Sequence, residues 1–287
     1  MELYLDCIPC FQKQALFATR EIPESKRAKI LKKVMELLLQ IEWNLSPDEI
    51  ANRVHALVRK EMGVEDPYKD LKKKSNQLVL KLYPELKKKI KGLPEEERLF
   101  YSAKLALAGN IIDFGPLTEF DIEKTLEEVL KKEPAINDFA LLKERVFNSK
   151  SLLYFCDNAG EIVFDRIFVE EMIENREKPF DRVVFVIKGG PILNDAMKED
   201  AIEAGLHKIP NVDFYEIGNG EPGTGPSRRD NIVKTWIDSF DLVISKGQGN
   251  FEGLSENKNL FFMLMAKCQI VAKKLGVNVG DVIIKYQ

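Results

Sequence analysis

The sequence predicts an α/β protein in which a three-layer α/β/α domain with a mostly parallel sheet (residues 149–287) follows an all-helical N-terminal region (residues 1–148). Apolar residues in the first half recur at the three-to-four spacing of a helix face. In the second half, short continuous apolar runs alternate with helix-like stretches. This alternation is typical of a parallel sheet covered by helices on both faces.

Helices in the first half are indicated by apolar stripes and start signals. The apolar positions between residues 30 and 41 form one core-facing stripe. Ser46-Pro47-Asp48-Glu49 predicts a helix start, with Ser46 as N-cap and Pro47 in the first helical position. Residues 102–112 are dense in Ala and Leu, as in a buried helix.

Five strands are expected in the second half, at Leu152–Cys156, Arg182–Ile187, Val212–Ile217, Asp241–Ser245 and Asp281–Tyr286. The helices between them are expected to begin near Glu161, Asn194, Ser227 and Lys267.

Composition excludes several classes of partner. The chain is 45% hydrophobic and 31% charged, and 43 basic against 46 acidic residues leave a formal charge of −3. This balance gives no electrostatic footprint for nucleic acid or an anionic membrane surface, so we expect neither as a partner. The sequence shows no membrane-spanning run and no signal-peptide pattern, which leads us to expect a cytoplasmic protein. Oligomeric state is not predicted.

The loops that follow the expected strands carry the candidate chemistry. Ligands of parallel α/β sheets bind outside the carboxyl ends of the strands. Asp157, Asn158 and Asp195 lie in two such loops and offer only oxygen ligands, which select hard cations such as Mg²⁺ or Mn²⁺. The alternative is that both aspartates cap the following helices. Lys246, flanked by Gly247, is expected to neutralise a bound phosphate.

Other motifs are weaker. Residues 218–223 spell G-x-G-x-x-G, but this loop follows the third expected strand rather than the first, so a substrate loop is favoured over dinucleotide binding. Ala159 stands where a haloacid-dehalogenase-type phosphatase carries its acid/base aspartate, which argues against that chemistry. Cys7 and Cys10 form a C-x-x-C pair without a second pair for a zinc site, so buried structural thiols and a functional role both stay open.

Taken together, these segments resemble one family. Residues 157–161, 189–195 and 245–252, with the Cys7-x-x-Cys10 pair, look like the damage-control phosphatase family, long called domain of unknown function 89, and most of all its cysteine-bearing prokaryotic and archaeal subfamily. The resemblance covers essentially the whole chain. It implies a phosphatase that hydrolyses small phosphorylated metabolites with Mn²⁺, Mg²⁺, Co²⁺ or Ni²⁺.

The resemblance also implies roles for individual residues. Asp157, Asn158 and Asp195 correspond to the family's metal ligands. The implied substrate contacts are Glu161 and the pocket segment from Gln248 to Glu252, which includes Asn250. The implied phosphate contact is Lys267, and Asn110 and Asp113 are implied to reach the cleft from the helical region.

The sequence thus favours a metal-dependent phosphoric monoester hydrolase acting on sugar phosphates, cofactor fragments or nucleotides. One alternative is a non-catalytic or thiol-regulated metabolite-binding protein built around the cysteines, which include Cys156 and Cys268. Another is a nucleotide-dependent oxidoreductase that uses the 218–223 loop. Whether Asp157 acts as a covalent nucleophile or the metal activates a water is not decided by the sequence.

Overall fold

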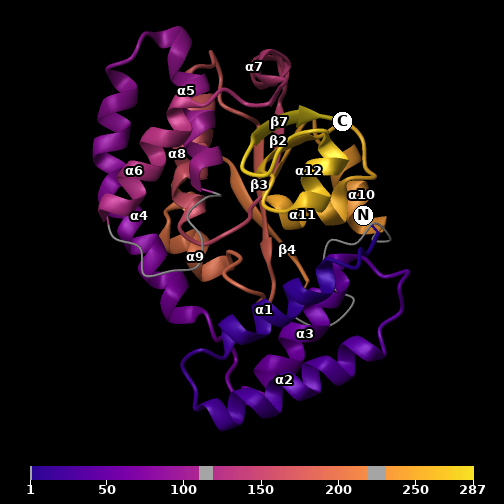
Figure 1. Cartoon of the computed structure of the whole chain (residues 1–287). Coiled ribbons are helices and arrows are strands. Elements are labelled where there is room, and N and C mark those ends of the chain that lie inside the picture. The colour runs from indigo at the N-terminus through magenta and orange to yellow at the C-terminus, as the bar shows by residue number, and fades with distance from the viewer. Residues whose placement is uncertain (1, 110–118, 219–230) are drawn as a thin grey trace.

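A mixed β-sheet runs through the centre of the molecule (Figure 1). The computed structural model describes residues 2–109, 119–218 and 231–287. Within them the sheet has seven strands in the order β1-β7-β6-β5-β2-β3-β4. Their bounds are β1 Ile136–Asn137, β2 Ser151–Phe155, β3 Arg182–Lys188, β4 Val212–Ile217, β5 Leu242–Lys246, β6 Phe261–Met265 and β7 Val282–Tyr286. All neighbours pair in parallel except β6 and β7, which are antiparallel.

Helices surround this sheet and also form the first third of the chain. The α-helices are α1 Cys7–Ala18, α2 Glu24–Leu39, α3 Pro47–Met62, α4 Lys69–Lys91, α5 Glu95–Gly109, α6 Glu119–Lys131, α7 Phe139–Asn148, α8 Glu161–Glu174, α9 Lys198–Glu203, α10 Asn231–Asp238, α11 Gln248–Leu254 and α12 Gln269–Leu275. A 3₁₀ turn, Leu206–Lys208, follows α9.

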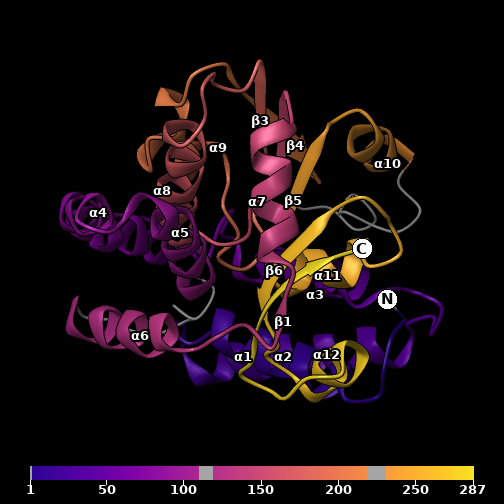
Figure 2. The ribbon, with the colours of Figure 1, turned by 90° about the horizontal axis from the view of Figure 1, so that it is seen from above.

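Two cores cover the two faces of the sheet. Side chains alternate between faces along a strand, so Leu152 and Tyr154 of β2 pack with α4, α5 and α8, whereas Leu153 and Phe155 pack with α10, α11 and α12. Viewed from above, the two groups of helices lie on opposite sides of the strands (Figure 2). The predicted three-layer α/β/α fold with an N-terminal helical region is therefore confirmed.

Helices α1, α2 and α3 form a third core of their own. Ile30 and Val34 of the predicted stripe are buried there. Helix α3 starts as predicted, with Pro47 in its first turn and a capping box in which Glu49 Oε2 accepts from both the amide and the hydroxyl of Ser46 (2.8 and 2.7 Å). Leu193, from the loop after β3, packs against this core. This contact links the helical unit to one edge of the candidate site.

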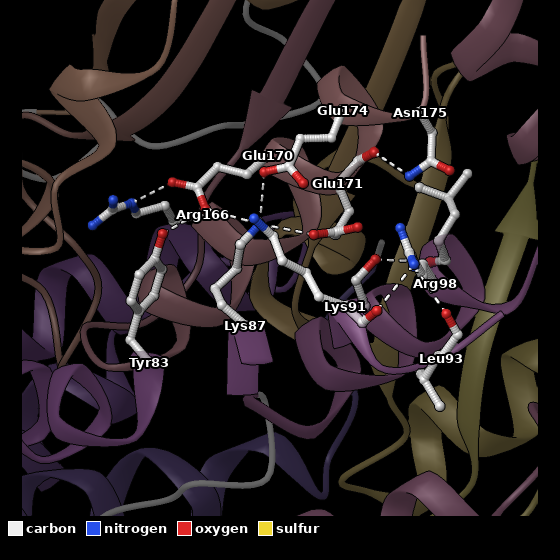
Figure 3. Close-up of polar contacts among 12 residues, drawn as sticks. Tyr83, Lys87, Lys91, Leu93, Arg98, Arg166, Glu170, Glu171, Glu174 and Asn175 are labelled. Atoms are coloured by element: carbon white, nitrogen blue, oxygen red, sulfur yellow. Dashed lines mark hydrogen bonds and ion pairs between the residues drawn. The ribbon is translucent and has the colours of Figure 1, made fainter. Parts of the chain in front are cut away.

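An ion-pair cluster fixes α4 on α8 (Figure 3). Lys87 Nζ contacts carboxylate oxygens of Glu170, Glu171 and Glu174 at 3.4, 2.7 and 3.0 Å. The Tyr83 hydroxyl donates to Glu170 at 2.6 Å. Because α8 starts at the candidate site, this cluster helps to hold the site loop in place.

The structure also departs from the sequence prediction. It contains two further strands, β1 and β6, and β1 belongs to the stretch expected to be all-helical. A five-residue apolar run such as β6 has no periodicity that separates strand from helix. Helix α9 begins at Lys198, four residues after the expected start at Asn194, because residues 194–196 instead bond to the loop after β2.

Two expected features lie outside the described residues. The first is the last part of the helix predicted over residues 102–112, after Gly109. The second is the helix start predicted near Ser227. Most of the glycine-rich 218–223 loop lies outside them as well. The division at residue 148 into two regions stays a prediction. No helix in the described part of the chain is both long enough and apolar enough to cross a membrane.

Candidate active site

The candidate site lies at the carboxyl ends of three adjacent strands. Strand β2 pairs with β3 on one side and with β5 on the other, and such a reversal of strand order leaves a crevice where α/β proteins bind ligands. Asp157 follows β2, Asp195 lies in the loop after β3, and Gly247 follows β5. A cavity of about 560 Å³ opens here, and its other wall comes from α1 and α3.

The three predicted metal ligands come together in this crevice. Asn158 and Asp195 form an isolated antiparallel bridge, and the Ala196 amide donates to the Asp157 carbonyl at 2.8 Å. Asn158 Nδ2 donates to Asp157 Oδ2 at 2.8 Å and to Glu161 Oε2 at 3.2 Å. All three residues line the cavity.

Close backbone packing holds the Asp157 carboxylate from the β5 side. Gly247 has φ +80°, and a Cβ there would lie 1.9 Å from Asp157 Oδ2. A side chain at this position is excluded by both its conformation and the space available. Gly247 is therefore needed so that the backbone after β5 can lie against the Asp157 carboxylate.

Negative charge is concentrated in the site. Burial, reinforced by the charges of Glu161 and Asp195, raises the pKa of Asp157 well above its ordinary value. Burial also raises the pKa of Asp195, which the nearby Lys188 ammonium opposes. Lys188 Nζ lies 3.4 Å from Asp195 Oδ2.

Neither aspartate caps a helix. The N-cap of α8 is Gly160, and that of α9 is Met197, where the Asp200 side chain completes a capping box. The alternative that Asp157 and Asp195 serve only as helix caps is therefore wrong. Their carboxylates instead line the cavity.

Two lysines supply the positive charge on the described part of the cavity wall, namely Lys188 and Lys267. The Lys267 charge lowers the pKa of Asp157, so its ammonium acts on the same end of the cavity. Gln248 Oε1 accepts from the Lys267 amide at 2.8 Å and positions this loop. Lys267 and Gln248 were both expected at the site, whereas Lys188 was not.

Lys246 lies elsewhere. Its side chain is fully buried, and Nζ donates to Glu161 Oε1, Asp165 Oδ1 and the Ala106 carbonyl at 2.7, 2.7 and 2.9 Å. It does not line the cavity. With its donors taken by these three acceptors, Lys246 lies behind the described cavity wall and supports Glu161, and its expected action on phosphate stays a prediction.

Other expected substrate contacts fall in different places. Glu161 lies under Asn158 rather than on the cavity wall. Asn250 is buried and donates to the carbonyls of Cys156 and Lys246 at 2.9 and 2.7 Å, a bond pattern that joins β2 to β5. Asn110 and Asp113 lie outside the described residues.

Three of the four cysteines line the cavity, namely Cys7, Cys10 and Cys268, and all are free thiols. Burial raises the pKa of Cys7 and of Cys10, so both are protonated at neutral pH. Cys156 is buried behind the site, with its pKa raised well above the ordinary value. Such thiols are weak nucleophiles.

Two further cavity residues were not singled out by sequence, Lys188 and Asp48. Lys188 is the last residue of β3 and carried no prediction of its own. Asp48 was assigned to a helix start. Ser46 and Glu49 complete the capping box by themselves. The helix start therefore does not require Asp48, and this could have marked Asp48 as a residue with another role.

Comparison with known proteins agrees with this architecture. The model of the damage-control phosphatase ARMT1-like domain matches residues 3–283. The chain belongs to the damage-control phosphatase family. A damage-control phosphatase of Pyrococcus horikoshii is 33% identical over 99% of this chain and 97% of its own length. An uncharacterized protein of Methanocaldococcus jannaschii is 36% identical over 96% of this chain and 92% of its own length.

A solved structure extends the family match to the fold. The crystal structure of a member of the domain-of-unknown-function-89 family from P. horikoshii superposes with a TM-score of 0.84 at 31% identity, covering 100% of this chain and 99% of that one. Membership of the damage-control phosphatase family confirms the resemblance inferred from the residues. It supports phosphatase activity for this chain.

The residues present fit a divalent cation. Two carboxylates and an amide converge from neighbouring strand ends, and Asn158 uses its nitrogen to bond Asp157 and Glu161, which leaves its oxygen as the possible ligand atom. Oxygen donors of this kind suit Mg²⁺ and Mn²⁺. The concentration of negative charge around Asp157 also favours a cation there.

Proposed function

We propose that this protein is a metal-dependent phosphatase that hydrolyses small phosphorylated metabolites, with Mn²⁺, Mg²⁺, Co²⁺ or Ni²⁺ held by Asp157, Asn158 and Asp195. The observation that carries the proposal is the meeting of these three oxygen-bearing side chains with Lys188 and Lys267 in one cavity. Sugar phosphates, cofactor fragments and nucleotides are the candidate substrates.

Each residue has a role that its contacts support. A bound divalent cation would polarise the phosphate and offset the charge that develops during transfer. Lys188 and Lys267 neutralise the remaining phosphate charge from the cavity wall. Glu161 orients the Asn158 amide, and the buried Lys246 fixes Glu161 in turn. Gly247 lets the β5 backbone support Asp157.

A substrate screen with and without metal tests the proposal. Purified protein stripped with EDTA is assayed for phosphate release from p-nitrophenyl phosphate and from panels of sugar phosphates, cofactor fragments and nucleotides, before and after addition of each cation. We expect release only after a cation is restored. Hydrolysis at an equal rate in EDTA would contradict the metal requirement, and no hydrolysis under any condition would contradict the phosphatase.

The thiol-regulated alternative rests on Cys7, Cys10 and Cys268, which line the same cavity. If thiol chemistry governs function, Cys7→Ser with Cys10→Ser abolishes activity or ligand binding. If the thiols only shape the cavity wall, the double variant keeps metal-dependent hydrolysis. We expect the second result, because desolvation raises the pKa of Cys7 and of Cys10 and leaves both protonated and weakly nucleophilic.

A further inference from the structure

Asp48 lines the cavity, and its buried carboxylate has no hydrogen-bond partner among the described residues. Both of its oxygens are shielded from solvent, and neither is hydrogen-bonded within the described part of the chain. The Ser46 hydroxyl, the nearby side-chain donor, gives its proton to Glu49 at 2.7 Å. Buried carboxylate oxygens need donors, so Asp48 lacks a partner that a ligand in this cavity would provide.

Glu252 reinforces this acidic wall from another element. It belongs to α11 and lines the same cavity, where its Oε1 accepts from Gln248 Nε2 at 2.8 Å. Burial and the charge of Asp48 raise the pKa of Glu252 to about 7. The two carboxyls are therefore close enough for the charge of one to act on the other.

The positive charge on the described cavity wall comes from Lys188 and Lys267. Lys188 pairs with Asp195, and the Lys267 charge acts on Asp157. The Lys188 charge reaches Asp48 as well, but its ammonium is engaged with Asp195. The wall made by α1, α3 and α11 adds uncharged amides and thiols to the two carboxyls, namely Gln14, Asn52, Gln248, Cys7 and Cys10.

We propose that Asp48 and Glu252 select the non-phosphate end of the substrate: they bind a hydroxyl- or ammonium-bearing group and exclude a second anion. The inference rests on the proposed function, which places the phosphate at Lys188 and Lys267. A ligand hydroxyl or ammonium supplies the donor that Asp48 lacks. A ligand carboxylate supplies none, and the negative charge that Asp48 and Glu252 carry when ionised repels it.

Binding of three phosphonates of similar length tests this selection without any need for catalysis. 3-Aminopropylphosphonate, 3-hydroxypropylphosphonate and 2-carboxyethylphosphonate are titrated into the full-length protein in Mg²⁺ buffer by calorimetry. We expect the amine, the alcohol or both to bind at least tenfold more tightly than the carboxylate. If the amine binds more tightly than the alcohol, the non-phosphate end of the substrate carries an ammonium group. If the two bind equally tightly, that end carries a hydroxyl group.

Isosteric variants connect the preference to the two side chains. In Asp48→Asn and in Glu252→Gln, the affinity for the amine or alcohol phosphonate should exceed that for the carboxylate phosphonate by less than about threefold. Thermal unfolding of both variants should stay cooperative. Asp238→Asn, an exposed aspartate on α10, should leave it unchanged. Equal or tighter binding of the carboxylate, no binding of any probe, or an unchanged preference in both variants would overturn the inference.

The two proposals fail in different ways. Selective binding without metal-dependent phosphate release from any member of the substrate panel contradicts the proposed function and leaves the selection intact. Metal-dependent phosphate release from the panel without selectivity among the three phosphonates contradicts the selection alone.

Discussion

Buried charged side chains stabilise the base of the site, and Lys246 is the clearest case. Its ammonium bonds Glu161 and Asp165, and the other Asp165 oxygen, Oδ2, has no partner in the described structure. Burial raises the pKa of Asp165 to about 6, although the Lys246 charge opposes the shift. Removing the ammonium would leave two buried carboxyls without their cation.

Lys246→Met should therefore destabilise the fold. We expect a loss of about 3–5 kcal/mol in the free energy of unfolding, because breaking a buried ion pair leaves uncompensated charge. Urea denaturation measures it, and Lys273→Met, at an exposed position on α12, is the matched control. A Lys246→Met protein of normal stability with impaired phosphate binding would restore the original prediction of a phosphate contact.

His55, on α3, makes stability depend on pH. Burial lowers the pKa of His55 from 6.5 to about 3. The unfolded chain binds a proton here below about pH 6.5, whereas the folded chain does not until about pH 3, so acidification favours unfolding. We expect this histidine alone to cost about 2 kcal/mol between pH 7 and pH 5.

Denaturation at both pH values, in wild type and in His55→Gln, measures this contribution. The variant should lose about 2 kcal/mol less than the wild type between pH 7 and pH 5. An identical loss in the two proteins would show that His55 does not titrate as its burial implies.

At the residue scale, the sequence was most informative where chemistry requires a side-chain type. Asp157, Asn158 and Asp195 were found because oxygen donors at strand ends form a recognisable set, and the structure brings them together. Lys246 was expected beside the bound phosphate but lies behind the described cavity wall, because sequence does not reveal which way a strand-end side chain turns. Asp48 was missed because its position also suits a helix start.

Among the elements, α8 connects the core to the site. It begins at Glu161 and packs against α4 and α5. The cluster of Lys87 with three glutamates holds its far end (Figure 3). Glu171 is 1% exposed there. The position of the Asp157 loop thus depends on contacts that lie outside the cavity.

Lys87→Met should loosen this interface. We expect a loss of about 2 kcal/mol in stability, below the value for a fully buried pair because Lys87 keeps some solvent contact. Lys88→Met, at the next and exposed position, should change stability by less than about 0.5 kcal/mol. Equal effects of the two substitutions in thermal or urea unfolding would contradict the assigned role of the cluster.

The elements themselves were largely predictable. The ends of the five predicted strands lie within one residue of the observed ends, because continuous apolar runs bounded by polar loops are distinctive. Strand β1 is only two residues long and pairs with β7, far along the chain, so no local pattern marks it. The β6–β7 antiparallel pairing is likewise a long-range property.

For the whole molecule, the cavity is formed where two separately cored parts meet. Strand-end loops provide one wall, with the metal ligands and two lysines. Helices α1 and α3 provide the other, with Asp48, Cys7 and Cys10. Leu193 links the parts by packing into the α1–α3 core. This division suits a substrate whose phosphate and organic ends are recognised by different parts of the chain.

The most direct test of the central claim is the initial rate of p-nitrophenyl phosphate hydrolysis in saturating Mn²⁺, compared between wild type and Asp157→Asn. The variant should lose roughly 10²-fold or more in rate, because one carboxylate ligand of the cation is gone. Asp238→Asn should keep the wild-type rate. A folded Asp157→Asn protein that hydrolyses the substrate at the wild-type rate would contradict the account.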